Sequence, residues 1–284
     1  IMELSDHITF NSLSQLDRFY PKIKANPKSI DIGLRLNPEY SEVVTPLYDP
    51  CQKHSRFGVT KKEFDPSVIS KLDGLHFHCL CGLNSDALER TLNQIETSFS
   101  EALKQVKWVN FGGGHSLTSP DYNIEHLCDL ISNFQKKYDV QVILEPGEAI
   151  VYQAGYLVAQ VLDVMHNDMD IAVLDTSATA HMPDILEMPY RPHIAGAGQP
   201  TEFPFTYRLT GATCLSGDII GDFSFKSPLN VGQKLIFFDM AQYTMVKTTH
   251  FNGIQLPAIS KLTEEGHLEL VKTFGYETFK DRLS

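Results

Sequence analysis

Three consecutive glycines and one glutamate could together bind a phosphorylated ligand with an ionisable ring. Gly112, Gly113 and Gly114 follow one short apolar run, and Glu145 follows the next. Glycines allow backbone N–H groups to converge on an anion such as phosphate. A glutamate at the C-terminal end of a buried strand lies where α/β folds carry out chemistry. The pairing predicts a phosphorylated cofactor, although a tight strand-to-helix turn would also explain the glycines.

Histidine, cysteine and tyrosine supply the remaining candidates. His76 and His78 alternate along a predicted strand and therefore face the same side. No third ligand lies near them in the sequence, so we expect no metal site. Cys214 adjoins a Ser-Gly-Asp turn, which favours a position near the surface over the usual buried one. Tyr243 follows a short apolar strand, and core packing is the simple alternative for it.

In the first half of the chain, short apolar strands alternate with helical stretches. This alternation with tight loops predicts a parallel sheet, and a (β/α) barrel is its closed form. About five strands precede residue 152, whereas a closed barrel needs eight, so we expect further N-terminal strands outside this chain. The predicted strands are 6–11, 30–38, 74–78, 106–111 and 140–144, and the predicted helices are 14–20, 66–72, 85–105 and 123–138.

The second half reads as a β domain. Strands separated by Gly- and Pro-rich turns predict an antiparallel sheet, with a helix at the C-terminus. We therefore expect a partial (β/α) barrel over residues 1–152 and a C-terminal β domain with a terminal helix over 153–284. The strands predicted in this half are 156–165, 171–176, 211–215, 234–238 and 243–248, and the helix is 276–283.

Composition excludes several classes of protein. The 284 residues carry a formal net charge of −11 and no basic cluster, which argues against a nucleic-acid partner. The negative net charge either keeps the protein soluble or attracts a cationic substrate. No apolar run is long enough to span a membrane. The five cysteines are odd in number and scattered, which favours a reducing, cytoplasmic location over a disulfide framework.

The order of the motifs resembles that of the fold-type III pyridoxal-phosphate decarboxylases, the ornithine/diaminopimelate decarboxylase superfamily. Within it the chain is most similar to the carboxynorspermidine (carboxyspermidine) decarboxylases. The resemblance implies an alanine-racemase-like (β/α)8 barrel followed by an antiparallel β domain. It also implies decarboxylation of a small cationic carboxypolyamine in spermidine biosynthesis. The segments that carry the resemblance are 34–38, 55–58, 76–81, 109–115, 145–149, 174–175, 211–218 and 241–244.

The resemblance assigns roles around pyridoxal 5′-phosphate. Glu145 matches the acid that pairs with the pyridine nitrogen, and His78 matches the imidazole that stacks on the ring. Arg35 matches an arginine near the ring. Tyr243 matches a tyrosine that hydrogen-bonds the phosphate, alongside the glycine triplet.

On the substrate side, Cys214 matches the cysteine that reprotonates the substrate carbon after CO2 leaves. In the family it reaches the site from the partner subunit, so the resemblance implies a homodimer with shared active sites. Asp175 and Asp218 resemble acidic positions that contact substrate amines. Glu148 stands where relatives carry a phosphate-binding arginine, and it suits either an amine-rich substrate or a solvated surface.

Two departures leave alternatives open. Leu215 replaces a glutamate of the diaminopimelate enzymes, which argues against that substrate, although diaminopimelate or another basic amino acid stays the runner-up. No lysine matches the Schiff-base lysine of the family, and we expect it in a preceding segment. A catalytically inactive homologue that acts as a binding protein, or a phosphate-binding barrel enzyme without pyridoxal, would also fit. The two carboxypolyamines differ by one methylene, which the sequence does not rank.

Overall fold

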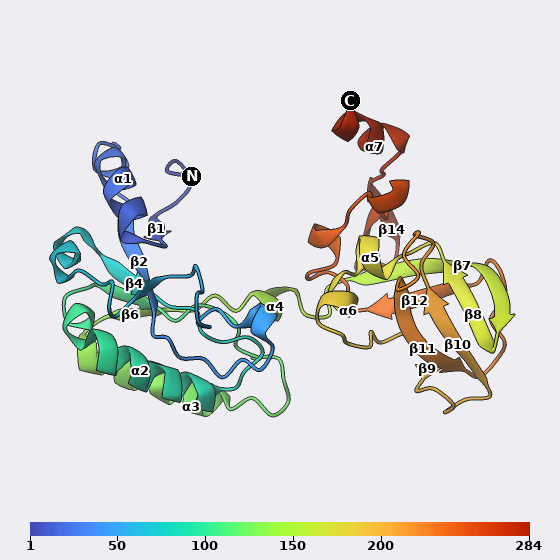
Figure 1. The fold of residues 1–284 in the computed structure, drawn as a ribbon, viewed down its shortest axis with the longest axis horizontal. Coiled ribbons are helices and arrows are strands. Elements are labelled where there is room, and N and C mark those ends of the chain that lie inside the picture. Colours follow the sequence, from blue (N-terminus) through green and yellow to red (C-terminus); the bar gives the residue numbers. More distant parts are fainter. The chain divides into compact units, whose positions relative to one another are not determined.

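The computed structural model describes all residues, 1–284, as two compact units, Ile1–Ile150 and Val151–Ser284 (Figure 1). Each unit contains its own hydrophobic core. The boundary expected after residue 152 lies beside the division between them. No helix in the structure is both long enough and apolar enough to cross a membrane.

The first unit is built on a parallel sheet. Its strands follow the order β1-β2-β4-β5-β6, and the short β3 pairs with β2. All five strands expected from the apolar runs are present, each somewhat shorter than predicted, and only β3 was not foreseen. Strands that are covered on both faces need apolar residues throughout, so each strand could be recognised in the sequence as an apolar run. The bounds are β1 His7–Phe10, β2 Asp31–Asn37, β3 Val59–Thr60, β4 Gly74–His76, β5 Trp108–Asn110 and β6 Gln141–Ile143.

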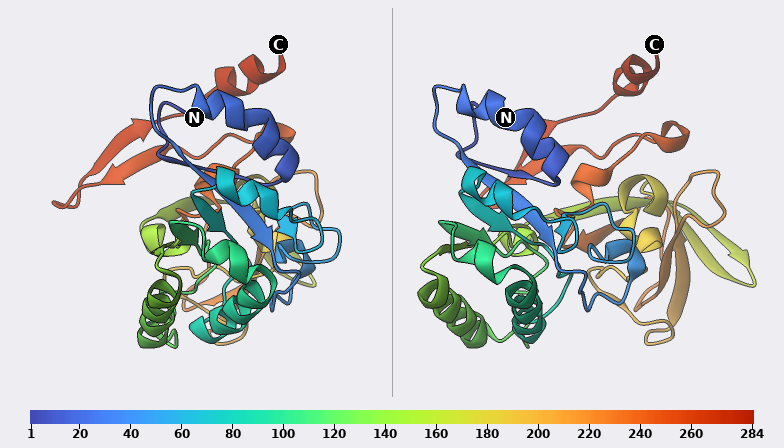
Figure 2. Two further views of the ribbon diagram at one scale, coloured as in Figure 1. Left: turned by 90° about the vertical axis from the view of Figure 1, so that its left-hand side faces the viewer. Right: turned by 60° about the vertical axis from the view of Figure 1, so that its left-hand side comes forward.

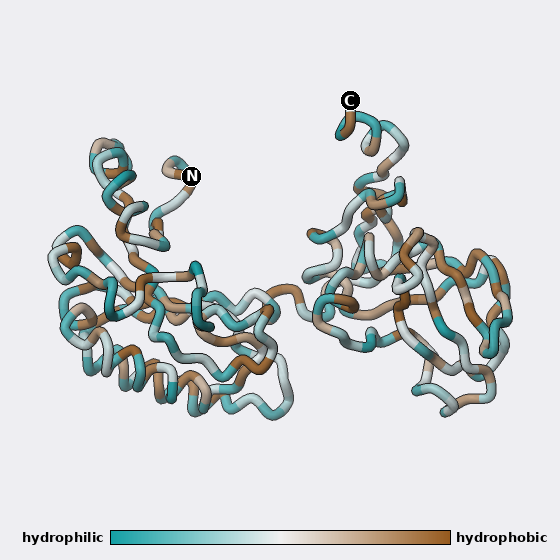
Figure 3. The backbone as a smooth tube through the Cα atoms, viewed as in Figure 1, coloured by the Kyte–Doolittle hydropathy of each residue, from teal (hydrophilic) through white to brown (hydrophobic).

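Two amphipathic helices, α2 (Ser85–Leu103) and α3 (Ile124–Tyr138), lie side by side against this sheet (Figure 2). Figure 3 shows hydrophobic and hydrophilic residues alternating along both of them. Each begins at an asparagine whose side chain accepts a backbone N–H, Asn84 for α2 and Asn123 for α3. The remaining α-helices of the unit are α1 Leu13–Lys24 and the short α4 Gly147–Val151, which directly follows Glu145 and Pro146. Two 3₁₀ helices, Pro46–Tyr48 and Pro66–Lys71, complete the unit, and the second is the helix predicted over 66–72.

The second unit contains a six-stranded sheet in the order β12-β7-β8-β10-β11-β9 and a separate β13-β14 hairpin. The sheet is mixed and not purely antiparallel as predicted, because β8 and β10 pair in parallel. The strands are β7 Tyr156–Asn167, β8 Met169–Leu174, β9 Ala197–Gly198, β10 Phe205–Thr210, β11 Ile219–Phe225, β12 Lys234–Phe238, β13 Ile259–Leu262 and β14 Leu268–Lys272; the helices are α5 Ala178–His181, α6 Asp184–Glu187 and α7 Tyr276–Leu283.

Two strands predicted in this unit, 211–215 and 243–248, were wrong. The first segment is a loop, because β10 ends at Thr210 and the Thr213 amide is bonded to the Asp218 side chain. The second is a turn followed by a 3₁₀ helix, Met245–Lys247. Tyr243 adopts a left-handed backbone conformation (φ 47°), which no strand accommodates. Lys247, in this 3₁₀ helix, pairs with Asp184 and Glu187 on α6.

Candidate functional site

The glycine triplet forms a turn between the C-terminal ends of β4, β5 and β6. Gly112 and Gly114 have φ values of 72° and 80°, a backbone conformation that residues other than glycine rarely adopt. A Cβ atom on Gly114 would lie 2.0 Å from the Leu80 carbonyl oxygen, and one on Gly113 would lie 2.4 Å from that of Glu145. The turn therefore requires glycine because neighbouring backbone packs directly against it.

The amides of this turn are not all available to a phosphate, which corrects the simple cradle expected from the sequence. The Gly112 N–H donates to Asn110 Oδ1 (2.8 Å), and the Gly113 N–H donates to His78 Nδ1 (3.0 Å). The Gly114 N–H has no intramolecular partner in the structure. Of the three amides of this turn, the Gly114 N–H is therefore the one free to donate to a ligand, and the other two hold the side chains of Asn110 and His78.

Glu145 lies two residues beyond β6 with its carboxylate held by two neighbours. Asn110 Nδ2 donates to Glu145 Oε1 at 2.8 Å, and His76 Nε2 lies 3.6 Å from Oε2. The His76 imidazole and, to a smaller extent, the Asn110 amide lower the pKa of Glu145 to about 2, against the opposing effect of burial. The carboxylate is therefore ionised at any working pH and can accept a hydrogen bond from a protonated ring nitrogen.

His78 lies in the loop after β4 and faces the same cavity as Glu145. Burial, together with the positive charge of Arg35, lowers the pKa of His78. Because Nδ1 accepts the Gly113 N–H, the neutral imidazole carries its proton on Nε2. The predicted strand 74–78 ends at His76, yet both histidines line the cavity.

This cavity has a volume of about 340 Å³ and lies at the C-terminal edge of the parallel sheet. Arg35, in β2, stacks its guanidinium over the Phe57 ring at 4.4 Å, and Arg56 lies over the same ring at 4.2 Å. The structure thus brings together three residues expected from the sequence, Arg35, His78 and Glu145. The cavity is lined by Arg35, Leu47, Tyr48, Asp49, Pro50, Phe57, His76, His78 and Glu145.

Glu148 does not line this cavity. It lies in the first turn of α4, where Thr118 Oγ1 donates to its carboxylate at 3.2 Å. No group of three or more His, Cys, Asp or Glu side chains is arranged to hold a metal ion.

The other predicted site residues belong to the second unit. Cys214 is exposed, and its backbone N–H donates to Asn252 Oδ1 at 2.8 Å. Asp218 is only 2% exposed, and its carboxylate is bonded by hydroxyls and amides of the same unit. Asp175 is exposed and accepts the Gln160 N–H at 2.7 Å. Of the two aspartates, only Asp175 is thus accessible to solvent.

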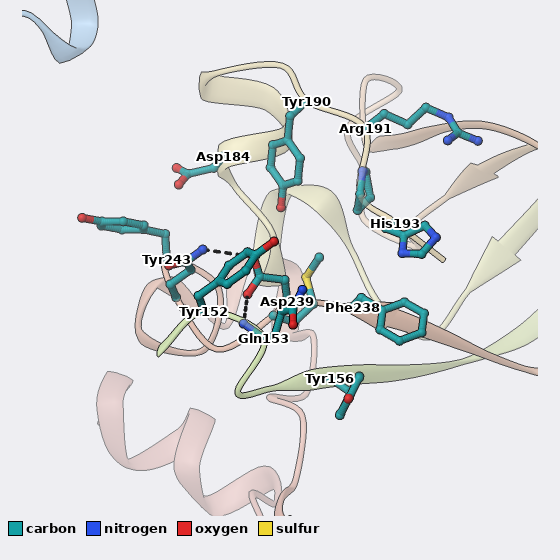
Figure 4. Close-up of a pocket in the computed structure, with 13 residues that line it drawn as sticks. Tyr152, Gln153, Tyr156, Asp184, Tyr190, Arg191, His193, Phe238, Asp239 and Tyr243 are labelled. Carbon is teal, nitrogen blue, oxygen red and sulfur yellow. Dashed lines mark hydrogen bonds between the residues drawn. The ribbon is translucent and has the colours of Figure 1, made fainter. Parts of the chain in front are cut away.

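Tyr243 stands at the rim of a second cavity, of about 720 Å³, in the same unit. Figure 4 shows its ring projecting away from the other labelled residues, and the residue is 62% exposed. Asp239 Oδ1 accepts the Gln153 N–H at 2.8 Å, and His193 stacks on Phe238 with ring centroids 4.9 Å apart. The wall is therefore aromatic and acidic, and Tyr243 presents its hydroxyl outward from it.

Three residues with clear roles in this geometry were missed by the sequence reasoning. His76 was noticed but given no role, although it faces Glu145. Asn110, a polar residue in a buried strand, joins Glu145 to the glycine turn. Asn252 accepts the Cys214 N–H. A polar side chain at the end of an apolar strand was the available signal for Asn110.

The chain is similar to known pyridoxal-dependent decarboxylases. Residues 31–241 match the family model described as pyridoxal-dependent decarboxylase, C-terminal sheet domain. The chain is 47% identical over its full length to a carboxyaminopropylagmatine decarboxylase from Synechocystis, covering 73% of that protein. Over 99% of its length it is 43% identical to a carboxynorspermidine/carboxyspermidine decarboxylase from Campylobacter jejuni, covering 76% of it.

Solved structures of decarboxylases are also similar to this chain. A crystal structure of the Campylobacter jejuni carboxynorspermidine decarboxylase complexed with norspermidine matches with a TM-score of 0.89 and 41% identity, over 99% of this chain and 76% of that one. A diaminopimelate decarboxylase matches with a TM-score of 0.81 at 19% identity, over 99% of this chain and 72% of that one, and shows the shared fold alone. The fold class expected from the sequence, a barrel-type α/β unit followed by a sheet domain, is confirmed.

Proposed function

Because this chain belongs to the pyridoxal-dependent decarboxylases, we propose that it is a carboxy-lyase that converts carboxynorspermidine or carboxyspermidine to norspermidine or spermidine. The observation that carries the proposal is the ionised Glu145 beside His76 and His78, in a chain that is 43% identical to a decarboxylase of these substrates. The net charge of −11 supports a cationic substrate.

The residues of the first unit fit pyridoxal phosphate. The glycine turn excludes side chains and leaves the Gly114 amide unpartnered, and Glu145 offers an ionised acceptor in the same unit. When bound, the cofactor supplies a protonated ring that accepts the electron pair left when CO2 departs. The chain's own contribution is to hold that ring nitrogen protonated through Glu145, and to present His78 to the ring and the Gly114 amide to the phosphate.

The second unit supplies the proton. Cys214 Sγ–H gives its proton to the substrate Cα, and the sulfur regains one from solvent. We expect a homodimer in which Cys214 of one subunit serves the cofactor of the other, and Tyr243, which points outward, to meet the phosphate. Asp175 is the better candidate for a substrate amine, because Asp218 is already buried among donors of its own unit. The five free cysteines support a reducing compartment such as the cytoplasm.

A second substrate has a specific observation in its favour. The Synechocystis protein, at 47% identity, is a carboxyaminopropylagmatine decarboxylase. Agmatine ends in a guanidinium group, whereas spermidine and norspermidine end in primary amines. The two substrate types therefore differ at the end far from the reacting carbon, where carboxylates pair with either group but with different geometry.

The test is an assay of the full-length protein with pyridoxal phosphate. Carboxynorspermidine, carboxyspermidine, carboxyaminopropylagmatine and diaminopimelate are supplied in turn, and CO2 and amine are both measured. We expect equal yields of CO2 and amine from at least one carboxypolyamine and none from diaminopimelate. Turnover of diaminopimelate alone, or of none of the four, would contradict the proposal.

A pair of variants tests the cofactor contact. Glu145→Gln removes the negative charge that keeps the ring nitrogen protonated, and we expect kcat to fall by about 10²-fold or more. Glu101→Gln, on the exposed face of α2, is the matched control and should retain wild-type kcat. Normal turnover by Glu145→Gln would remove Glu145 from the ring-partner role.

A further inference from the structure

We propose that Asn252 is a positioning residue that aims Cys214, and that it forms one end of a hydrogen-bonded clamp whose other end is the buried Asp218. The inference rests on the proposed function, in which Cys214 donates the proton to the substrate carbon. The thiol itself is exposed and free, so its direction is set by how the backbone around residue 214 is held.

The first end of the clamp is Asp218. Its carboxylate accepts hydrogen bonds from Thr213 Oγ1 at 2.7 Å and from Ser177 Oγ at 2.9 and 3.0 Å. The backbone amides of Thr213 and Thr179 also donate to it, at 3.3 and 3.2 Å. Gly211 lies against the same carboxylate, because a Cβ there would be 2.3 Å from Oδ2. The residue directly before Cys214 is thus fixed through both its side chain and its backbone.

The clamp continues through α5. Ser177 accepts the Ala180 N–H at 3.0 Å and so caps this helix. The helix then holds the segment that carries Asn252, since the Thr249 N–H donates to the Ala180 carbonyl at 2.8 Å. His181 Nε2 lies 3.1 Å from the Gln255 carbonyl oxygen, which only accepts, so that nitrogen carries the proton. Residues on both sides of Asn252 are therefore tied to the helix that Asp218 orients.

Asn252 closes the clamp. Its backbone is left-handed (φ 58°, ψ 18°), a conformation that asparagine adopts more readily than other side-chain-bearing residues. The turn is fixed by the Gly253 N–H, which donates to the His250 carbonyl at 2.8 Å. In this position Asn252 Oδ1 accepts the Cys214 N–H at 2.8 Å. The Cys214 backbone is consequently held from the Thr213 side and from the Asn252 side.

This arrangement has a chemical consequence for the proton-transfer step. The S–H bond of Cys214 breaks, its electron pair stays on sulfur as a thiolate, and the proton bonds to Cα of the substrate. A displacement of about 1 Å in such a donor can cost about 10²-fold in rate. If a proton bonds to another carbon of the conjugated system instead of Cα, CO2 is still released, but hydrolysis by water then yields a carbonyl compound in place of the amine. The ratio of amine to CO2 therefore reports how well Cys214 is aimed.

Two variants at one position isolate the contact. Asn252→Gly keeps the left-handed backbone but removes the acceptor, whereas Asn252→Asp keeps an acceptor oxygen in place. In Asn252→Gly we expect kcat to fall about tenfold or more with KM unchanged, and the yield of amine per CO2 to fall below one. Asn252→Asp should restore kcat to within about threefold of wild type and the yield to one.

A structural readout accompanies the kinetics. Hydrogen exchange of the Cys214 amide, followed by peptide mass spectrometry, should accelerate about tenfold in Asn252→Gly and stay near wild type in Asn252→Asp. Wild-type kcat and amine yield in Asn252→Gly, with the amide exchanging faster, would overturn the positioning role. So would an unchanged exchange rate, because the contact would then not hold the loop.

The far end of the clamp gives a second variant pair. Thr213→Val removes the hydroxyl that donates to Asp218, and Thr213→Ser retains it. Thr213→Val should lower the amine yield as Asn252→Gly does, and Thr213→Ser should not. Cys214→Ala separates this inference from the proposed function. Normal amine yield in Cys214→Ala refutes the proton-donor role itself, whereas a defect there beside a normal Asn252→Gly refutes only the clamp.

Discussion

The glycine turn at residues 112–114 and the loop at residues 211–218 each hold a functional group in place, but different interactions fix them. Each follows a strand end and presents a group expected to touch the reactants. The glycine turn is fixed by close backbone contacts that leave no room for a side chain. The loop is fixed by a buried carboxylate that gathers hydroxyls and amides from segments far apart in the sequence.

The contrast shows which kind of change each site tolerates. The glycine turn cannot gain an atom, and the side chains of Asn110 and His78 accept two of its backbone N–H groups. The loop has open space at Gly217, where an added Cβ would meet nothing within 4 Å. It cannot lose the acceptor oxygens of Asp218, because buried donors would be left without partners. A methyl group added at Gly114 therefore tests the glycine turn, and the loss of an Asp218 oxygen tests the loop.

The largest effect is expected from Gly114→Ala. Its Cβ would lie 2.0 Å from a backbone oxygen at φ +80°, so we expect a loss of about 4 kcal/mol in the free energy of unfolding of the first unit. Trp108 is the only tryptophan and lies in β5, so urea unfolding followed by its fluorescence reports this unit. Gly147→Ala, in the same unit and with nothing within 4 Å of an added Cβ, is the matched control and should stay within about 0.5 kcal/mol. Equal effects of the two substitutions would contradict the steric account of the turn.

Asp218→Asn should follow, with a loss of about 3 kcal/mol in the second unit. The amide replaces one carboxylate oxygen with a donor that faces the Ser177 and Thr213 hydroxyls. Hydrogen exchange of the β10 and β11 amides measures it, since this unit has no tryptophan.

Asp175→Asn is the matched control for that substitution. This aspartate is exposed and accepts one backbone N–H, so the expected loss is below about 1 kcal/mol. If both variants exchange alike, Asp218 does not organise the loop.

Local patterns predicted the first unit better than the second. The parallel strands are short apolar runs, and each was located to within a few residues. In the second unit β10 was missed, although Phe205, Tyr207 and Leu209 alternate with polar residues as a half-buried strand requires. The pairing of Ser177 with Asp218 spans 41 residues and depends on how α5 docks, which no local pattern encodes.

Local sequence patterns likewise predicted only part of the site. Glu145 was recognisable because an acid at a strand end is unusual. Its partners follow from sheet register, which pairs His76 with Asn110 and Asn110 with Ile143, two residues before Glu145. Register between strands separated by whole helices is set by tertiary packing. The roles of His76 and Asn110 therefore required the structure.

Asn110→Ala tests that registered link, with an expected loss of about 2 kcal/mol in the first unit. The side chain is 8% exposed, and its removal leaves the Gly112 N–H buried without a partner. Urea unfolding followed by Trp108 fluorescence measures it, because Trp108 lies in the same strand. Asn93→Ala, on the exposed face of α2, is the control and should change stability by less than about 0.5 kcal/mol. A loss no larger than that of Asn93→Ala would show that Asn110 does not hold the turn.

Near neutral pH, the smallest effect is expected from a pH change acting on His115, which follows the glycine turn. Burial, with a contribution from His78, lowers the pKa of His115 to about 4, and its Nε2 has no hydrogen-bond partner. An unfolded histidine has a pKa of about 6.5, so below that pH the unfolded chain binds a proton that the folded unit excludes. The stability of the first unit should therefore be level above pH 6.5.

Between pH 6.5 and about 4 that stability should fall by up to about 1.4 kcal/mol per pH unit from this residue. His115→Asn should flatten this part of the profile measured by Trp108 fluorescence, and His54→Asn, on the surface of the same unit, controls for the loss of a histidine. An unchanged slope in His115→Asn would mean that His115 is protonated inside the folded unit. The buried imidazole would then need an acceptor for Nε2 that the folded unit does not provide, and the packing behind the glycine turn would be looser than its contacts indicate.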